Sequence, residues 1–290
     1  MSRKSALNFA LIGFLWGIPY LFIKVAVDEE NGYAPAIVVF GRVLIGALIL
    51  IPLAFRDRSI FAALRGIKYV TFYAVLEMII PWILIGTAEQ KISSGLAGLL
   101  IASVPIWSNL ITYFQGDKEA LKTNRLLGIG IGFVGVVLIV GIESLTGSSD
   151  PLSIVMVIVA AIGYAYAIIM IRSKLPDVSG IAINGVAMAI TAIFYLPFTI
   201  ILWPDHAVSA NATYSVIALG IFSTGIAFAF FFTLIADIGP TRASLVTYWN
   251  TAIAVVLGVI ILSEPLTVGI RIGLPLVMLG SWLVNRREKV

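Results

Sequence analysis

Ten long runs of apolar residues, separated by short polar connections, make up most of this chain. A helix needs about 20 mostly apolar residues to cross a lipid bilayer. Measured against that length, the runs predict ten spanning helices, at about 7–27, 34–55, 68–88, 93–114, 125–143, 153–172, 181–202, 213–236, 241–262 and 268–284. The connections hold nearly all Lys and Arg, and none has room for a soluble domain. The pattern therefore predicts an all-α polytopic membrane protein.

Composition supports this class and excludes several others. Hydrophobic residues make up 60% and charged residues 12% of the 290 positions, whereas a soluble domain is about half apolar and about a quarter charged. Cys is absent and His206 is the single histidine, which excludes thiolate chemistry and His-rich metal sites. The net charge of +4 is thinly spread and gives little support for nucleic-acid binding. We expect a protein that contacts the lipid bilayer, with neither a metal nor a cofactor.

The positions of the positive charges predict the orientation. If the N-terminus is cytoplasmic, 15 of the 19 Lys and Arg residues fall on the cytoplasmic side. The opposite side then holds only Lys24, Lys91 and Arg271, and Arg42 lies inside a span. Because cytoplasmic loops carry the excess of Lys and Arg in membrane proteins, the sequence predicts that both termini lie in the cytoplasm.

The two halves of the sequence resemble each other. A Glu-x-Leu segment followed by two glycines recurs at a constant offset of 145 residues, as Glu119, Leu121, Gly128 and Gly135 and then as Glu264, Leu266, Gly273 and Gly280. At an offset of 148, Trp16-Gly17 and Lys24 correspond to Tyr164-Ala165 and Arg172. We therefore predict two repeats, 1–148 and 149–290, within one membrane domain. Each repeat has five spans, so the second enters the membrane from the opposite face, and such inverted repeats build transporters.

These motifs carry a resemblance to a known family. The pattern WGxxYxxxK at Trp16–Lys24, together with the two Glu-x-Leu-x6-Gly segments, resembles the drug/metabolite transporter superfamily, EamA type, over essentially the whole chain. The sequence is also similar to the YddG-type exporters of amino acids, bacterial inner-membrane proteins with aromatic amino acids among their substrates. The resemblance implies a monomer with a central cavity lined by spans 1–4 and 6–9, and with spans 5 and 10 at the periphery. The first Glu-x-Leu segment, GDKEALK, is more polar than the second, LSEPLT, so the two ends are not equivalent.

Aromatic and polar residues at helical spacing within the spans are candidates for a substrate site. Ser244, Thr247, Tyr248 and Thr251 fall on one face of span 9. The candidate substrate-binding residues are Trp16, Tyr20, Met78, Trp82, Ser103, Trp107, Tyr166, Ser244, Tyr248 and Asn250. Aromatic rings interleaved with hydroxyls and thioethers suit a small amphipathic ligand. The alternative is structural, because Trp and Tyr also form interfacial belts and small polar residues hold helices together.

Two charged residues lie near the middle of the membrane, and three of the prolines inside the spans are candidates for kinks. Arg42 and Glu77 have similar depth on consecutive spans, which makes a buried ion pair feasible. Such a pair is either a structural link or part of substrate or proton handling. Pro19, Pro81 and Pro105 lack a backbone N–H and predict helix kinks, which can serve as gates.

One motif in a predicted span is rejected as a nucleotide site. Residues 130–135 read GIGFVG, but a dinucleotide site needs a preceding strand and an acidic residue about 20 positions later. Gly128 and Gly132 instead form a G-x-x-x-G motif, which predicts close helix packing.

The leading interpretation is a secondary transporter that exports amino acids by alternating access. A multidrug or nucleotide-sugar carrier of the same superfamily is the alternative within transport. A membrane-embedded enzyme is disfavoured because Cys is absent, His206 is predicted in a loop and no Asp lies well inside a span. A non-catalytic sensor or scaffold leaves the inverted repeat without explanation.

Overall fold

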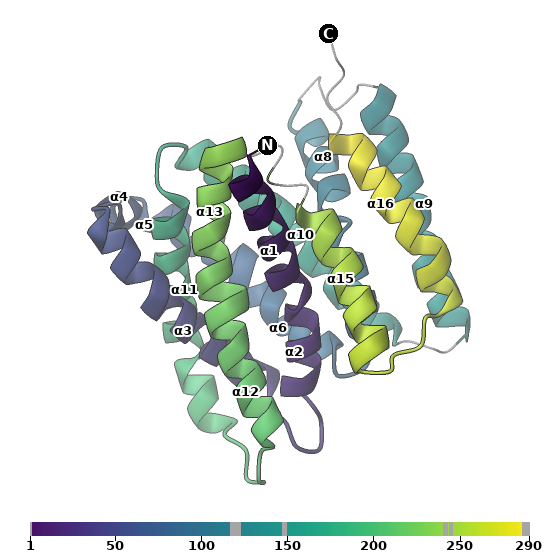
Figure 1. Ribbon diagram of the computed structural model, residues 1–290, viewed down its shortest axis with the longest axis horizontal. Helices are drawn as coiled ribbons and strands as arrows, with labels where there is room; N and C mark the ends of the chain where they lie inside the picture. The colour runs from purple at the N-terminus through teal and green to yellow at the C-terminus, as the bar shows by residue number, and fades with distance from the viewer. Residues whose placement is uncertain (1, 117–122, 147–149, 240–242, 244–245, 286–290) are drawn as a thin grey trace.

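The computed structural model describes residues 2–116, 123–146, 150–239, 243 and 246–285, and every regular element among them is helical (Figure 1). The first half contains α1 (Arg3–Gly17), α2 (Pro19–Ala26), α3 (Pro35–Arg56), α4 (Ile60–Arg65), α5 (Ile67–Ala74), η1 (Val75–Ile79), α6 (Ile80–Ala88), α7 (Ser94–Ile101), α8 (Val104–Phe114) and α9 (Thr123–Thr146). The second half contains α10 (Pro151–Lys174), α11 (Gly180–Ile201), α12 (Ala210–Ala218), η3 (Leu219–Ile226), α13 (Ala227–Ile238), α15 (Val246–Ile261) and α16 (Val268–Asn285). The elements η1 and η3 are π-helical stretches.

The prediction of an all-helical polytopic membrane protein is confirmed. Among the described residues, seven continuous or nearly continuous helices are long and apolar enough to cross a membrane. Three further apolar helices are shorter, at Arg125–Leu138, Trp249–Ile261 and Val268–Leu283. These helices overlap the ten predicted ranges, whereas the arrangement as five plus five spans stays a prediction.

Each of the three prolines that the sequence predicted to kink a span lies just after a change in helix geometry. Pro19 begins α2, Pro105 is the second residue of α8, and Pro81 is the second residue of α6, directly after η1. A proline is tolerated in the first turn of a helix because the N–H it lacks would have no partner there. The predicted kinks therefore coincide with breaks or π-helical stretches, whereas a gating role stays a prediction.

The break between α7 and α8 frees backbone carbonyls inside the membrane. Ser281 of α16 donates its hydroxyl to the carbonyl oxygen of Ala102, at 2.8 Å. Ser103 donates its hydroxyl to the carbonyl of Leu100, at 2.6 Å. Because no water reaches the hydrocarbon region to satisfy such groups, these hydroxyls make the break possible.

The helices pair across the two halves of the chain. Helix α9 packs along α16, α3 packs along α11, α1 packs against α13 and α15, and α10 packs against α6, α7 and α8. Figure 1 shows α9 and α16 side by side at one edge of the molecule. Three buried apolar clusters lie between the helices, and Tyr164 of α10 packs against the two larger ones.

Glycines account for the close approach of α9 and α16. A Cβ atom on Gly280 would lie 2.4 Å from the backbone nitrogen of Gly132 and 2.6 Å from the carbonyl oxygen of Gly128. Only glycine at position 280 permits this separation of the two backbones. The packing role predicted for the Gly128 and Gly132 motif is confirmed.

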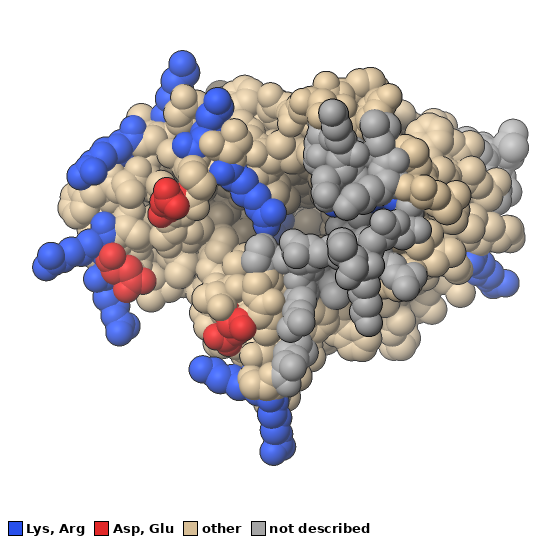
Figure 2. All heavy atoms as spheres, turned by 90° about the horizontal axis from the view of Figure 1, so that it is seen from above, with Lys and Arg blue, Asp and Glu red and all other residues tan. Residues whose placement is uncertain are grey.

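The start of α1 and the end of α16 lie at the same end of the molecule in Figure 1. Viewed from that end, the surface carries many Lys and Arg side chains, fewer Asp and Glu, and a hollow near its middle (Figure 2). This is the face that the charge distribution predicts to be cytoplasmic.

Candidate functional site

The centre of the site is Arg42, in the middle of α3. Arg42 is 7% exposed, and the carbon atom of its guanidinium group lies 3.7 Å from the ring centroid of Trp82 on α6. Its Nε and Nη2 atoms both donate to the hydroxyl of Thr224 on η3, each at 3.3 Å. A guanidinium group over an indole ring is attracted by the negative face of the ring. Nη1 donates to no residue that the structure describes and is available for a ligand.

Small residues bring α3 close enough to η3 to form this contact. A Cβ on Gly46 would lie 2.7 Å from the methyl group of Thr224, and a Cβ on Gly220 would lie 2.6 Å from Ile45. Glycines at helix contacts in membranes allow the backbones to approach closely. The sequence of α3 and η3 therefore places the Thr224 hydroxyl against the guanidinium group.

Two tyrosines and a carboxyl group surround Arg42. Tyr20 of α2, Tyr164 of α10 and Glu89 at the end of α6 all lie close enough to act electrostatically on its charge. The side chains therefore come from five segments, α2, α3, α6, α10 and η3. We call Tyr20, Arg42, Trp82, Tyr164 and Thr224 the Arg42 cluster.

Glu77 lies on η1, near this cluster but not bonded to Arg42. Its Oε2 atom is buried and has no hydrogen-bond partner among the described residues. No salt bridge joins these two described side chains in this structure, so the ion pair that the sequence made feasible is not formed in this conformation. The prediction treated the spans as straight α-helices. In the structure the guanidinium group is turned toward η3 and Trp82, and η1 alters the register of the helix that carries Glu77.

Of the predicted binding residues, Tyr20 and Trp82 belong to the Arg42 cluster. Trp16 and Trp107, two other predicted binding residues, contact protein side chains outside this cluster. Trp16 packs against Phe228 and Phe231 of α13, with ring centroids 5.4 and 4.5 Å apart. Trp107 donates from its indole N–H to the hydroxyl of Ser103 at 3.0 Å.

Met78 and Asn250 also have protein partners. The sulfur of Met78 accepts a hydrogen bond from Thr191 of α11, at 3.9 Å. The Oδ1 atom of Asn250 accepts a hydrogen bond from the Thr251 hydroxyl at 3.3 Å. Ser244 lies outside the described residues, as does the side chain of Tyr248.

Tyr166, another predicted binding residue, does not lie in the Arg42 cluster. Tyr166 is 39% exposed and packs edge-on against the exposed ring of Phe72, with centroids 6.4 Å apart. Residues two apart on an α-helix point about 200° apart. Tyr164 therefore faces the cluster and Tyr166 faces away from it.

Sequence reasoning missed Tyr164 and Thr224 as site residues. Tyr164 corresponds to Trp16 in the repeat comparison, which is a signal that could have found it. Thr224 carried no such signal, because its role depends on the π-helical geometry of η3.

The opposite end of the molecule from the termini is held together by two charged side chains. Lys24 of α2 donates to backbone carbonyls of the α6–α7 connection, and Glu264 accepts from backbone N–H groups at the start of α7. Glu264 belongs to the second Glu-x-Leu segment, so the structure gives that motif a physical role.

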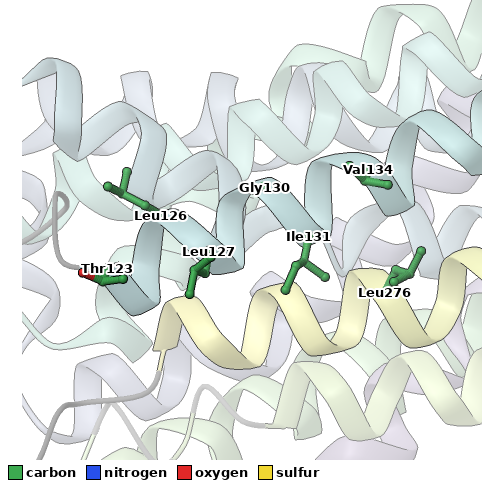
Figure 3. A pocket seen from close by; sticks show the side chains of 7 residues that line it. All are labelled: Thr123, Leu126, Leu127, Gly130, Ile131, Val134 and Leu276. Atoms are coloured by element: carbon green, nitrogen blue, oxygen red, sulfur yellow. The ribbon is translucent and has the colours of Figure 1, made fainter.

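An apolar groove of about 500 Å³ lies along α9 and α16 (Figure 3), and no residue of the Arg42 cluster lines it. Its lining side chains are Thr123, Leu126, Leu127, Ile131, Val134 and Leu276, with Gly130 between them. Such a lining offers one hydroxyl and no charge. Within the described residues, no group of three His, Cys, Asp or Glu side chains could hold a metal ion.

Comparisons with known proteins agree with the helical membrane fold. The model of the EamA-like transporter family matches the chain twice, at residues 3–141 and 151–286. The chain is 23% identical to the uncharacterized transporter YoaV of Bacillus subtilis over 97% of this chain and 96% of the relative. It is 27% identical to an uncharacterized transporter of Archaeoglobus fulgidus over 98% of this chain and 100% of that one.

Further similarity extends to another bacterial relative and to a solved structure. The uncharacterized inner membrane transporter YedA of Escherichia coli K12 is 23% identical over 84% of this chain and 78% of its own length. One crystal structure superposes with a TM-score of 0.65 at 16% sequence identity, covering 98% of both chains, which supports the fold. With both halves matched by the family model, the chain belongs to the EamA-like transporter family, and it is a multi-pass membrane transporter.

Proposed function

We propose that this protein is a secondary transporter that exports amino acids, aromatic and other neutral ones, by alternating access. The observation that carries the proposal is the Arg42 cluster. It holds a buried guanidinium group among aromatic rings, with a carboxyl group at Glu77 that is not paired with it.

A zwitterion has the two charges that such a site requires. The substrate carboxylate binds the free edge of the Arg42 guanidinium group, because arginine presents N–H donors in a planar fork that matches a carboxylate. The substrate ammonium group lies toward Glu77. The side chain of the substrate packs on Tyr20, Trp82 and Tyr164, which suits a flat apolar group.

The architecture behind this site is a five-plus-five inverted repeat. Helix α1 packs against α13 and α15, and α10 packs in the corresponding way against α6 and α7. The pairs α3 with α11 and α9 with α16 each join equivalent spans of the two halves. This exchange of partners, with the double match of the family model, supports two repeats that meet at the substrate site.

The orientation and setting follow from the same features. The basic face that carries both termini is cytoplasmic, and the protein works as a monomer in the bacterial inner membrane. The hollow on that face and the closed contacts at the opposite end correspond to a conformation open to the cytoplasm. Substrate therefore enters the site from inside the cell.

The test is transport by the purified protein in liposomes. We would measure counterflow of labelled tryptophan and phenylalanine and competition by two series of analogues, amines that lack the carboxylate and acids that lack the amine. Zwitterions should compete strongly and both truncated series weakly, because each loses one charged contact. Equal competition by the amines would contradict the role of Arg42.

A result with no amino-acid transport would overturn the proposal. The same liposomes would then be loaded with cationic drugs and with nucleotide sugars, the substrates of the alternative carriers. A cationic drug that moves would contradict a site built around a buried arginine. Transport of a nucleotide sugar would still be consistent with Arg42 as the contact for an anionic group, but it would contradict a zwitterionic substrate.

A further inference from the structure

The connection between α6 and α7, residues 89–93, is held by Lys24 of α2. The Lys24 ammonium group donates to the carbonyl oxygens of Glu89 at 2.5 Å, Ile92 at 3.0 Å and Gln90 at 3.4 Å. An ammonium group has three N–H donors. All three are therefore used on the backbone of this connection.

Glu264 holds the other side of the same segment. Its carboxylate accepts from the backbone N–H groups of Ser94 at 2.7 Å and Gly95 at 3.2 Å, and from the Ser94 hydroxyl at 2.9 Å. The first N–H groups of a helix have no partner within it, and a carboxylate there is favoured by the helix dipole. A Cβ on Gly258 would lie 2.2 Å from the Glu264 carboxylate, so glycine leaves the space that it occupies.

We call Lys24, Glu264 and residues 89–95 the outer clamp. It joins α2 and the α15–α16 connection, from opposite halves of the chain, to the start of α7. Opening this end of the molecule requires the clamp to release α7.

The side chain of Glu89 is enclosed within the outer clamp. Glu89 is 0% exposed, and neither of its carboxyl oxygens has a hydrogen-bond partner among the described residues. The charged groups that act on it are Lys24 from α2, Glu264 from the α15–α16 connection and Arg42 from α3. The hydroxyl of Tyr20 also lies within electrostatic reach of Glu89.

The two neighbouring cations do not donate to Glu89. The donors of Lys24 are used on the backbone, and Arg42 is turned toward Thr224 and Trp82. A buried ionised carboxylate without hydrogen bonds costs far more free energy than the neutral acid. Burial raises the pKa of Glu89, which lies just beyond the span Ile67–Ala88, well above its usual value; Lys24 opposes this shift and Glu264 adds to it.

We propose that the carboxyl group of Glu89 is a proton-binding site that controls the opening of the outer clamp. A proton on Glu89 accompanies the closed clamp, and loss of the proton favours release, which frees the Lys24 ammonium group to pair with the carboxylate. The proposal rests on the alternating access of the proposed function, but not on the identity of the substrate.

The direction of the pH dependence follows. The closed clamp raises the proton affinity of Glu89 relative to the open one, so the closed state is favoured at low pH. That preference is lost as the pH rises through the pKa of the closed state.

The test measures opening without any substrate. The chain has no Cys, so a single reporter can be introduced by Ala97→Cys, at a buried position of α7. We would measure the rate at which a maleimide labels this thiol in nanodiscs between pH 5 and pH 9. The rate at Asp205→Cys, where the side chain is fully exposed, corrects for ionisation of the thiol itself.

The corrected rate should rise with pH by up to about tenfold per pH unit, the limit for one linked proton. Glu89→Gln, which resembles the protonated form, should give a low rate with no pH dependence. Glu89→Asp keeps the carboxyl and should retain the dependence, as should Glu77→Gln.

Three outcomes would overturn the proposal. The first is a corrected labelling rate that does not change with pH in the protein that carries only Ala97→Cys. This measurement does not depend on whether a Glu89 variant folds. The second is an unchanged profile in Glu89→Gln. The third is loss of the dependence in Glu77→Gln, which would assign the proton to Glu77. A wrong substrate class would show only in the liposome counterflow and would leave these rates unaffected.

Discussion

The α9–α16 pair and the Arg42 cluster both join the two halves of the chain, but they differ in what they bury. The pair brings glycine backbones together and presents apolar side chains to its groove. The cluster buries a guanidinium group, hydroxyls and aromatic rings, next to π-helical stretches. Contacts of the first kind hold a membrane protein together, and polar groups of the second kind inside a membrane mark substrate pathways.

This comparison predicts that substitutions at the pair reduce stability and substitutions in the cluster reduce transport. The sharpest case for stability is Gly280→Ala, whose new methyl group meets the backbone of Gly132. Backbone atoms cannot rotate away, so we expect a loss of about 1–3 kcal/mol or more. The fraction of protein that survives heating in detergent measures it.

Gly130→Ala is the matched control for this substitution. Gly130 lies on the same pair of helices, but a Cβ there would meet no atom within 4 Å. Alanine is favoured over glycine inside a helix by up to about 1 kcal/mol. Equal melting of both variants would contradict the packing role of Gly280.

Arg42→Gln should have the largest effect on transport. It removes the group that we propose binds the substrate carboxylate. A hydrogen bond to a charged group contributes about 1.5–3 kcal/mol, which is about tenfold to 150-fold in affinity. Counterflow kinetics of a labelled amino acid measure this loss, with the folded fraction monitored by gel filtration. Arg56→Gln, at an exposed position of the same helix, should transport normally. Loss of folded protein without loss of affinity would place Arg42 with the structural contacts instead.

A smaller effect is expected from removing one hydroxyl of the cluster. Tyr164→Phe removes the hydroxyl that interacts with the side chain of Trp82 and keeps the aromatic ring. It should weaken transport by a few-fold, because a single neutral hydrogen bond contributes about 0.5–1.5 kcal/mol. Tyr166→Phe changes the same group on the opposite face of α10 and should have no effect. Competition curves with one labelled substrate compare the two variants, and a stronger effect in Tyr166→Phe would reverse the assignment.

The smallest expected effect is a change in thermal stability from a substitution at the start of α10, outside both the α9–α16 pair and the Arg42 cluster. Asp150 accepts hydrogen bonds from the backbone N–H and the hydroxyl of Ser153, and these lower the pKa of its carboxyl group. A carboxyl with a lowered pKa stabilises the fold above its unfolded pKa, and this contribution is lost as the pH falls through the folded value. Melting of Asp150→Asn should therefore differ from that of the unmodified protein at neutral pH and converge with it in acid. A constant difference at all pH values would exclude this cap.

The apolar runs of the sequence predicted the helical membrane class, because length and hydropathy are local properties. The glycine motif at Gly128 and Gly132 was also readable, since close packing depends on spacing alone. The residues that contact Arg42 could not be predicted from the sequence. The prediction that Arg42 could pair with Glu77 assumed regular α-helices. The choice between Tyr164 and Tyr166 depends on which face of α10 points toward the interior, which the sequence did not reveal.

The surroundings of Glu89 also could not be predicted from the sequence. It lies at the end of a predicted span, where a carboxylate is expected in water, and its burial arises from Lys24 and Glu264, which are distant in the sequence. Contacts between segments that are far apart decide such sites, and one sequence does not contain them.

The stretches η1 and η3 occupy corresponding places in the two halves, in the third and eighth predicted spans. A π-helical turn contains an additional residue relative to an α-helical one. Converting such a turn to α-helix moves the surplus residue elsewhere and rotates the adjoining segment by about 100°, the angle of one residue. A span with this geometry can exchange one inward-facing row of side chains for another by turning about its own axis. For the proposed alternating access, these two stretches offer a movement by torsion, in which a helix turns while its ends keep their places at the membrane surfaces.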